Sequence, residues 1–164
     1  MSKIDKVFFS GDFLKKCEDW LKRFPENQRR SAVIEILKLV QKENGGYLNE
    51  KLIGDVADYL GMPRIFAYEV ATFYSMFDLN KVGRYKICFC VSISCMLCGS
   101  DDLVAHVKRR LGIDFDETTV DGKFTLKKVE CLAACGSAPV VLIGEKYYEN
   151  LTVESIDSIL SNLE

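Results

Sequence analysis

The sequence predicts an α+β protein in which an N-terminal helical bundle is followed by a small α/β domain. Residues 1–80 carry apolar side chains at the i, i+3, i+4 spacing of helices that bury one face. From Arg84 onward, apolar and other residues alternate, as they do along a half-buried strand. The segment DLNKVG at residues 78–83 separates the two patterns, so we expect domains at 1–80 and 84–164.

Four helices are expected in the first domain. The first is capped by Ser10 or Asp12, and the third is capped by Asn49 and ends before Gly61. Pro63 suits the first turn of the fourth helix. The apolar stripes are, in order, Phe13, Leu14, Cys17, Trp20, Leu21 and Phe24; Val33, Ile36, Leu37 and Val40; Leu52, Ile53, Val56 and Leu60; and Phe66, Val70, Phe73, Tyr74 and Phe77.

The second domain has the pattern of a small α/β sandwich with the order β-α-β-β-α. A helix follows Asp101 and ends at Gly112, and Thr152 caps a closing helix. Asp121 and Gly122 form a good turn pair. The expected strands cover residues 85–91, 124–129, 140–143 and 147–148, the last two joined through Gly144.

Composition excludes several classes of function. The chain has 22 Lys and Arg against 24 Asp and Glu, so it lacks the basic surface of a nucleic-acid-binding protein. No apolar run reaches the roughly 18 to 20 residues that span a bilayer, which argues against membrane insertion. The N-terminal segment MSKIDKVFFSGDF lacks the apolar core and cleavage site of a secretory signal. We therefore expect a cytoplasmic protein.

Six of the seven cysteines lie between residues 88 and 135. Cysteines of a reducing compartment are more often metal ligands, reactive thiols or buried apolar groups than disulfide partners. Two pairs stand out, Cys90 with Cys95 and Cys131 with Cys135, and each follows an expected strand. Four thiolates on two loops match the needs of a [2Fe-2S] cluster, which takes two sulfurs on each iron.

Spacing alone leaves two other assignments open. Cys90, Cys95 and Cys98 match the spacing of plant-type ferredoxins, with Cys131 as a distant fourth ligand. Cys95, Cys98, Cys131 and Cys135 also form a plausible zinc tetrad. The pattern favours iron and sulfur over zinc. Apolar neighbours are expected to keep water from the cysteines: Ile93, Met96, Leu97, Leu132 and Pro139.

Longer blocks of sequence carry a family resemblance. Cys90 to Cys95 followed by MLCGSDDL, then ECLAACGSAPVV and YYENLT, resembles the thioredoxin-like [2Fe-2S] ferredoxin module, in particular that of the E subunits of bacterial NADH:quinone oxidoreductase (respiratory complex I). FPENQRRSAVIEILKLVQ, GGYLNEKLIGDVADYLGM and VATFYSMF are similar to the helical region of the same family. The likeness covers about residues 15–163, and it implies a thioredoxin-like α/β domain after the helical bundle.

The resemblance also implies a ligand set. In that family C-x4-C and C-x3-C supply all four ligands, which here are Cys90, Cys95, Cys131 and Cys135. Cys98 is then a thiol near the cluster rather than a ligand. Where the family usually has glycine, in CLGAC, this chain has Ala133, so the local conformation of that loop is in question. Cys88 and Cys17 are expected in the strand core and in a helix stripe, respectively.

The implied function is electron transfer. A neighbouring subunit of the complex would bind NADH and FMN, and this chain would accept one electron from the flavin, beside further iron–sulfur subunits. The chain would then belong to NADH dehydrogenase on the cytoplasmic side of the inner membrane, with no catalytic residue or complete active site of its own. Related modules serve NAD(P)-linked hydrogenases and formate dehydrogenases, and a zinc-stapled interaction protein is the non-redox alternative.

Two remaining features have simpler interpretations. His106 is the sole histidine, so neither a Rieske site nor a histidine-dependent nucleophile is available, and we expect it on a solvated helix face. Residues 49–78 resemble a helix-turn-helix but carry a net charge of −3, from two basic and five acidic side chains, which phosphates would repel. The aromatic residues of this segment are expected mostly in the bundle core, some of them against a partner subunit.

Overall fold

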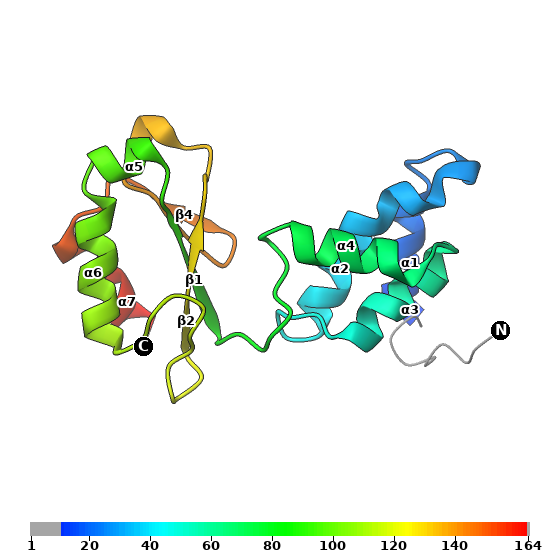
Figure 1. Ribbon diagram of the computed structural model, residues 1–164, viewed down its shortest axis with the longest axis horizontal. Coiled ribbons are helices and arrows are strands. Elements are labelled where there is room, and N and C mark those ends of the chain that lie inside the picture. Colours follow the sequence, from blue (N-terminus) through cyan, green and yellow to red (C-terminus); the bar gives the residue numbers. More distant parts are fainter. Residues whose placement is uncertain (1–10, 164) are drawn as a thin grey trace. The chain divides into compact units, whose positions relative to one another are not determined.

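The structure, a computed structural model, describes residues 11–163 (Figure 1). The chain divides into two compact units between Lys81 and Val82, and each unit is described by itself. The first unit is helical and the second combines helices with a four-stranded sheet, which confirms the α+β class. Within the described residues, no helix is both long and apolar enough to span a membrane.

All four expected helices of the first unit are present. Asn49 accepts a hydrogen bond from the Leu52 N–H at 2.9 Å, and Gly61 ends that helix at φ 67°. The first helix starts at Gly11, so Asp12 lies inside its first turn and is not its cap; Ser10 falls outside the described residues. The elements are α1 (Gly11–Leu21), an unexpected 3₁₀ helix (Glu26–Ala32), α2 (Val33–Glu43), α3 (Glu50–Leu60) and α4 (Arg64–Phe73).

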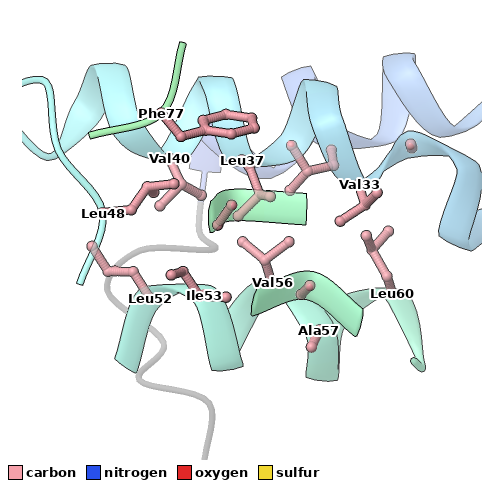
Figure 2. Packing of buried hydrophobic residues seen from close by; sticks show 14 of the residues in the cluster. Val33, Leu37, Val40, Leu48, Leu52, Ile53, Val56, Ala57, Leu60 and Phe77 are labelled. Atoms are coloured by element: carbon pink, nitrogen blue, oxygen red, sulfur yellow. The ribbon is translucent and has the colours of Figure 1, made fainter. Parts of the chain in front are cut away.

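The apolar stripes of α2 and α3 meet in the core of the first unit. Figure 2 shows Leu37 and Val40 of α2 facing Val56 of α3. Phe77, which follows α4, closes the same core and is 6% exposed. Each such side chain contributes roughly 1.5–3 kcal/mol through burial. The bundle therefore has a hydrophobic core of its own.

The expectation for α4 was wrong for most of its aromatic residues. Its buried positions are Ala67 and Ala71, whose small side chains let the helix approach the bundle closely. The larger side chains consequently point outward. Those exposed are Phe66 at 46%, Tyr68 at 41%, Phe73 at 80% and Tyr74 at 37%.

The second unit contains one sheet with the strand order β2-β1-β3-β4. β1 and β2 are parallel, whereas β3 pairs antiparallel with both β1 and β4. All four expected strands are present, and the last two, β3 and β4, are joined through Gly144, which has φ 62°. The expected order β-α-β-β-α counted these two as one. The elements are β1 (Tyr85–Cys90), α5 (Ile93–Leu97), α6 (Ser100–Leu111), β2 (Phe124–Val129), a 3₁₀ turn (Cys135–Ser137), β3 (Val141–Ile143), β4 (Lys146–Tyr148) and α7 (Val153–Asn162).

The helices α6 and α7 pack against the sheet and against each other. Their buried residues form one cluster with the sheet: Ile87, Phe89, Leu103, Val107, Phe124, Leu126, Val141, Ile143, Leu151, Ile156 and Leu160. Thr152 caps α7 as expected, in a capping box with Ser155. His106 is not a freely solvated residue, because its Nε2 lies 2.8 Å from Asp157 Oδ1, and Arg110 also contacts that carboxylate. This polar cluster joins α6 to α7.

The start of β1 is bound tightly to β2. The Gly83 N–H donates to Thr125 Oγ1 at 2.6 Å, and the Tyr85 N–H donates to the Lys123 carbonyl at 2.7 Å. A Cβ on Gly83 would lie 2.9 Å from the backbone of Lys123, so this close approach requires glycine. The two parallel strands thus enter the sheet together and end together.

Candidate metal centre

Two parallel strands deliver the cysteine pairs to one end of the sheet. Cys90 is the last residue of β1, and it pairs in register with Val129, the last residue of β2. The loop after β1 leads to Cys95 on α5, and the loop after β2 carries Cys131 and Cys135. The topology therefore brings both pairs to the same edge.

The first pair lies in the protein interior. Cys90 is 3% exposed and Cys95 is 1% exposed, and both pack with Val140. Ser92 is the N-cap residue of α5, and its carbonyl accepts from the Met96 N–H at 2.9 Å. The short helix is thereby set directly after β1, which turns Cys95 back toward Cys90.

The second pair is exposed and lies on irregular backbone. The Ala133 N–H donates to Cys131 Sγ at 3.2 Å, and Ala133 has φ 56°, in the left-handed region. The segment between β4 and α7 holds this loop by backbone hydrogen bonds. The Asn150 N–H donates to the Ser137 carbonyl at 2.7 Å. The Leu151 N–H also donates to the Pro139 carbonyl, at 3.3 Å. Cys135 begins the 3₁₀ turn of this loop.

Electrostatics links the two pairs. Burial raises the pKa of Cys90, but hydrogen bonds from the backbone N–H groups of Ser92 and Leu132, together with the thiols of Cys95 and Cys131, outweigh it and lower that pKa. Burial raises the pKa of Cys95, as do its hydrogen bond to Cys90 and the charges of Cys90 and Cys135. Each buried cysteine therefore interacts with one cysteine of the exposed pair, Cys90 with Cys131 and Cys95 with Cys135.

The donor set consists of four thiols, two at the end of β1 and on α5 and two on the loop after β2. A zinc tetrad needs four ligands around one ion, whereas a [2Fe-2S] cluster takes two sulfurs on each iron. Cys98 is exposed at the C-cap of α5. It is not among the groups that most change the pKa of Cys90 or Cys95. The pairs Cys90–Cys95 and Cys131–Cys135 fit the two-metal group.

The other cysteines occupy the expected positions. Cys88 is buried on β1, at 6% exposure. Cys17 is fully buried in the stripe of α1, where burial above all, and the charge of Glu18, raise the pKa of its thiol to about 11. Neither is placed on the two loops that carry the candidate ligands.

Only some of the apolar residues expected to keep water from the cysteines are buried. Leu132 packs on Cys90 and Cys95, and Pro139 is buried. Ile93, Met96 and Leu97 point outward from α5 instead, with 66%, 44% and 77% exposure. Sequence reasoning also missed the two backbone hydrogen bonds from Asn150 and Leu151, since backbone donors carry no residue-type signal.

Comparisons with known proteins agree with this geometry. The profile described as thioredoxin-like [2Fe-2S] ferredoxin matches residues 17–164. The chain belongs to the thioredoxin-like [2Fe-2S] ferredoxin family. The E subunit of the NADH-quinone oxidoreductase of Rickettsia conorii is 45% identical over 163 residues, which cover 99% of this chain and 98% of that protein. Its counterpart of the same name in Rickettsia felis is 48% identical, over 93% of this chain and 91% of that one.

A solved structure supports the fold of this family member. The NAD⁺-reducing [NiFe]-hydrogenase in its air-oxidised state superposes with a TM-score of 0.69 at 20% identity. The match covers 85% of this chain and 24% of the hydrogenase chain. At this identity the likeness concerns the fold alone, and it extends over both units of the ferredoxin-family chain.

Proposed function

We propose that this chain is the electron-transferring E subunit of an NADH:quinone oxidoreductase. It holds one [2Fe-2S] cluster on Cys90, Cys95, Cys131 and Cys135 and accepts one electron at a time from a flavin. The observation that carries the proposal is the meeting of two cysteine pairs at one edge of the sheet. The similarity to E subunits of NADH-quinone oxidoreductases, 45% and 48% identity over nearly the whole chain, supports the choice of complex.

The chain's own groups hold the cluster and stabilise its charge. When bound, the cluster supplies one-electron transfer. The N–H groups of Ser92 and Leu132 donate to Cys90, and that of Val140 donates to Cys95, which favours the thiolate form that metals require. Such hydrogen bonds to ligand sulfur also tune the reduction potential. Proton transfer is not required of any side chain, so the chain needs no catalytic acid or base.

The proposed partners follow from the chemistry of NADH. A hydride carries two electrons, and a flavin accepts them together and releases them singly. A neighbouring flavoprotein subunit would therefore bind NADH and FMN, with further iron–sulfur subunits beside it. We assign partner docking to domain 1–80 and cluster binding to domain 84–164, with contact also through the cluster-side face. The complex would lie on the cytoplasmic side of the inner membrane.

The second candidate is the equivalent subunit of an NAD(P)-linked hydrogenase, or of a formate dehydrogenase. The fold shared with the NAD⁺-reducing hydrogenase is the observation that favours it over a zinc-stapled interaction protein. Both redox assemblies would give this chain the same role beside a flavin. They differ in the terminal subunits, so neighbouring genes and co-purified proteins distinguish them.

Anaerobic purification of the intact assembly tests the proposal. We expect a brown protein with equal iron and acid-labile sulfide, recovered with a flavoprotein that oxidises NADH and with quinone-reducing membrane subunits. Recovery with hydrogenase subunits would instead establish the second candidate. A colourless chain that carries zinc would refute both.

A further inference from the structure

Four polar side chains join α6 to α7, and we call them the α6–α7 clamp. His106 Nε2 lies 2.8 Å from Asp157 Oδ1, and the Arg110 guanidinium donates to the same carboxylate. Arg110 also donates to Ser161 Oγ at 2.9 Å. The side chains of His106, Arg110 and Asp157 are 26%, 29% and 35% exposed, so water screens their contacts less than on open surface. The clamp is therefore a connected network and not an isolated surface ion pair.

The spacing of the clamp residues fixes the position of α7 along α6. His106 and Arg110 are one helical turn apart on α6, and Asp157 and Ser161 are one turn apart on α7. The apolar stripe of α7 also packs in the core of the unit, but apolar contacts have no preferred direction. Charge-assisted hydrogen bonds do have one. Contacts on two successive turns therefore resist sliding and rotation of α7.

A short segment connects α7 to the loop that carries the exposed cysteine pair. Thr152 caps α7, and Asn150 and Leu151 come directly before this cap. The N–H groups of Asn150 and Leu151 donate to the carbonyls of Ser137 and Pro139, at 2.7 and 3.3 Å. Leu151 is buried in the same apolar cluster as α7. Because Leu151 adjoins the cap of α7, a shift of α7 changes both hydrogen bonds to the loop.

We propose that the α6–α7 clamp is a positioning device for the candidate metal centre, with Asp157 at its middle. The clamp fixes α7, the segment before α7 fixes the loop of Cys131 and Cys135, and the fixed loop retains the cluster. The inference rests on the proposed function, because it takes a [2Fe-2S] cluster as the group that this loop holds. Asp157 acts as a positioning residue and not as a ligand, through contiguous hydrogen bonds and packed elements. The rate of cluster loss then follows how often the loop opens.

Transfer of iron to a chelator measures cluster retention. The full chain is loaded with its cluster under anaerobic conditions, and its visible absorption is followed after bathophenanthroline disulfonate is added. We expect Asp157→Asn to lose the cluster about three- to tenfold faster, because a neutral amide accepts weaker hydrogen bonds from His106 and Arg110. The matched control is Asp114→Asn, which removes a carboxylate that lies 2.5 Å from Lys108 Nζ, beyond the C-terminal end of α6. This control is expected to change the rate by less than about twofold.

Hydrogen exchange of the cluster-loaded chain distinguishes positioning from a general loss of stability. In Asp157→Asn we expect peptides that contain Asn150 and Leu151 to exchange their amide hydrogens at least about threefold faster, while peptides of β1 and β2 keep the rate of the unaltered chain. Equal acceleration throughout the second unit overturns the inference, and so does an unchanged rate of cluster loss. If Asp157→Asn does not fold, His106→Gln replaces it, and the same two results count against the clamp.

The fate of the proposed function is read separately. An unaltered chain that takes up no [2Fe-2S] cluster overturns the proposed function and the clamp together. A folded Asp157→Asn chain that takes up no cluster, while Asp114→Asn still does, is the strongest form of the expected result. The other contrary results remove the clamp alone and leave the proposed function in place.

Discussion

The two cysteine pairs are built in different ways. Cys90 and Cys95 lie in the interior, at the end of a strand and on a helix, where Val140 packs against both. Cys131 and Cys135 are exposed on a loop whose conformation depends on backbone hydrogen bonds. The first pair is therefore positioned by folding itself, whereas the second has few packing contacts to hold it. Half of the candidate site is held by side-chain packing, and the other half is held by backbone hydrogen bonds.

The largest effect is expected from a substitution that removes one of the four candidate ligands. We expect Cys135→Ser to abolish or severely alter the visible spectrum of the cluster, because a hydroxyl is a poor substitute for a thiolate ligand. The matched control is Cys98→Ser, which changes another exposed cysteine and is expected to leave the spectrum nearly intact. The reverse result would establish the plant-type assignment with Cys98 as a ligand.

Alkylation by iodoacetamide at pH 8 separates the exposed pair from the buried thiols. In cluster-free protein we expect Cys131 and Cys135 to react at least about 100-fold faster than Cys17, since Cys17 is fully buried and its pKa is raised to about 11. A raised pKa keeps this thiol neutral at pH 8. With the cluster bound, Cys131 and Cys135 are protected and Cys98 still reacts. Mass spectrometry of peptides measures each site, and rapid labelling of Cys17 in folded protein contradicts the burial argument.

The contribution of each pair to the stability of the cluster-free fold should also differ. We expect Cys95→Ser to lower the free energy of unfolding by about 1–3 kcal/mol, because it buries a hydroxyl among apolar neighbours. Cys131→Ser at its exposed position is expected to change it by less than about 0.5 kcal/mol. Urea denaturation under reducing conditions measures both. Equal effects would mean that the two loops are equally well packed.

A smaller effect than that of Cys95→Ser is expected from the backbone of the second loop. Ala133 occupies the left-handed region at φ 56°, which costs about 1–2 kcal/mol for a residue with a Cβ. Glycine removes that cost but loses roughly 0.4–1 kcal/mol through the entropy of the unfolded chain. We therefore expect Ala133→Gly to stabilise the protein by about 0.5–1 kcal/mol in urea denaturation. A loss of stability would show that the alanine methyl group makes a compensating contact.

Periodicity and capping residues predicted the helices and strands well, because those signals are local. Asn49, Gly61 and Thr152 each occupy the expected cap or helix end. The outward aromatic residues of α4 were missed, since an apolar stripe does not reveal that Ala67 and Ala71 make the close contact. The pairing of His106 with Asp157 joins residues 51 positions apart, which no local pattern contains.

The candidate site was predictable in part. The pairing of Cys90 with Cys95, and of Cys131 with Cys135, follows from spacing, and the family likeness reduced three ligand assignments to one. The difference in burial between the pairs was not predictable, because it depends on where Val140 and Leu132 pack. The exposed orientation of Leu97 likewise depends on how α5 sits against the sheet.

The segment that connects the two units is held by hydrogen bonds at both of its ends. On one side Asp78 is held through its N–H by Gln41 and through its carbonyl by Leu48, and on the other Gly83 is held by Thr125. Only residues 79–82 lie between these anchors. Since lengthening a surface connection costs little free energy, residues inserted beside Asn80 would extend the tether without loosening either core. The reach of the connection between the two units can thus be lengthened one residue at a time.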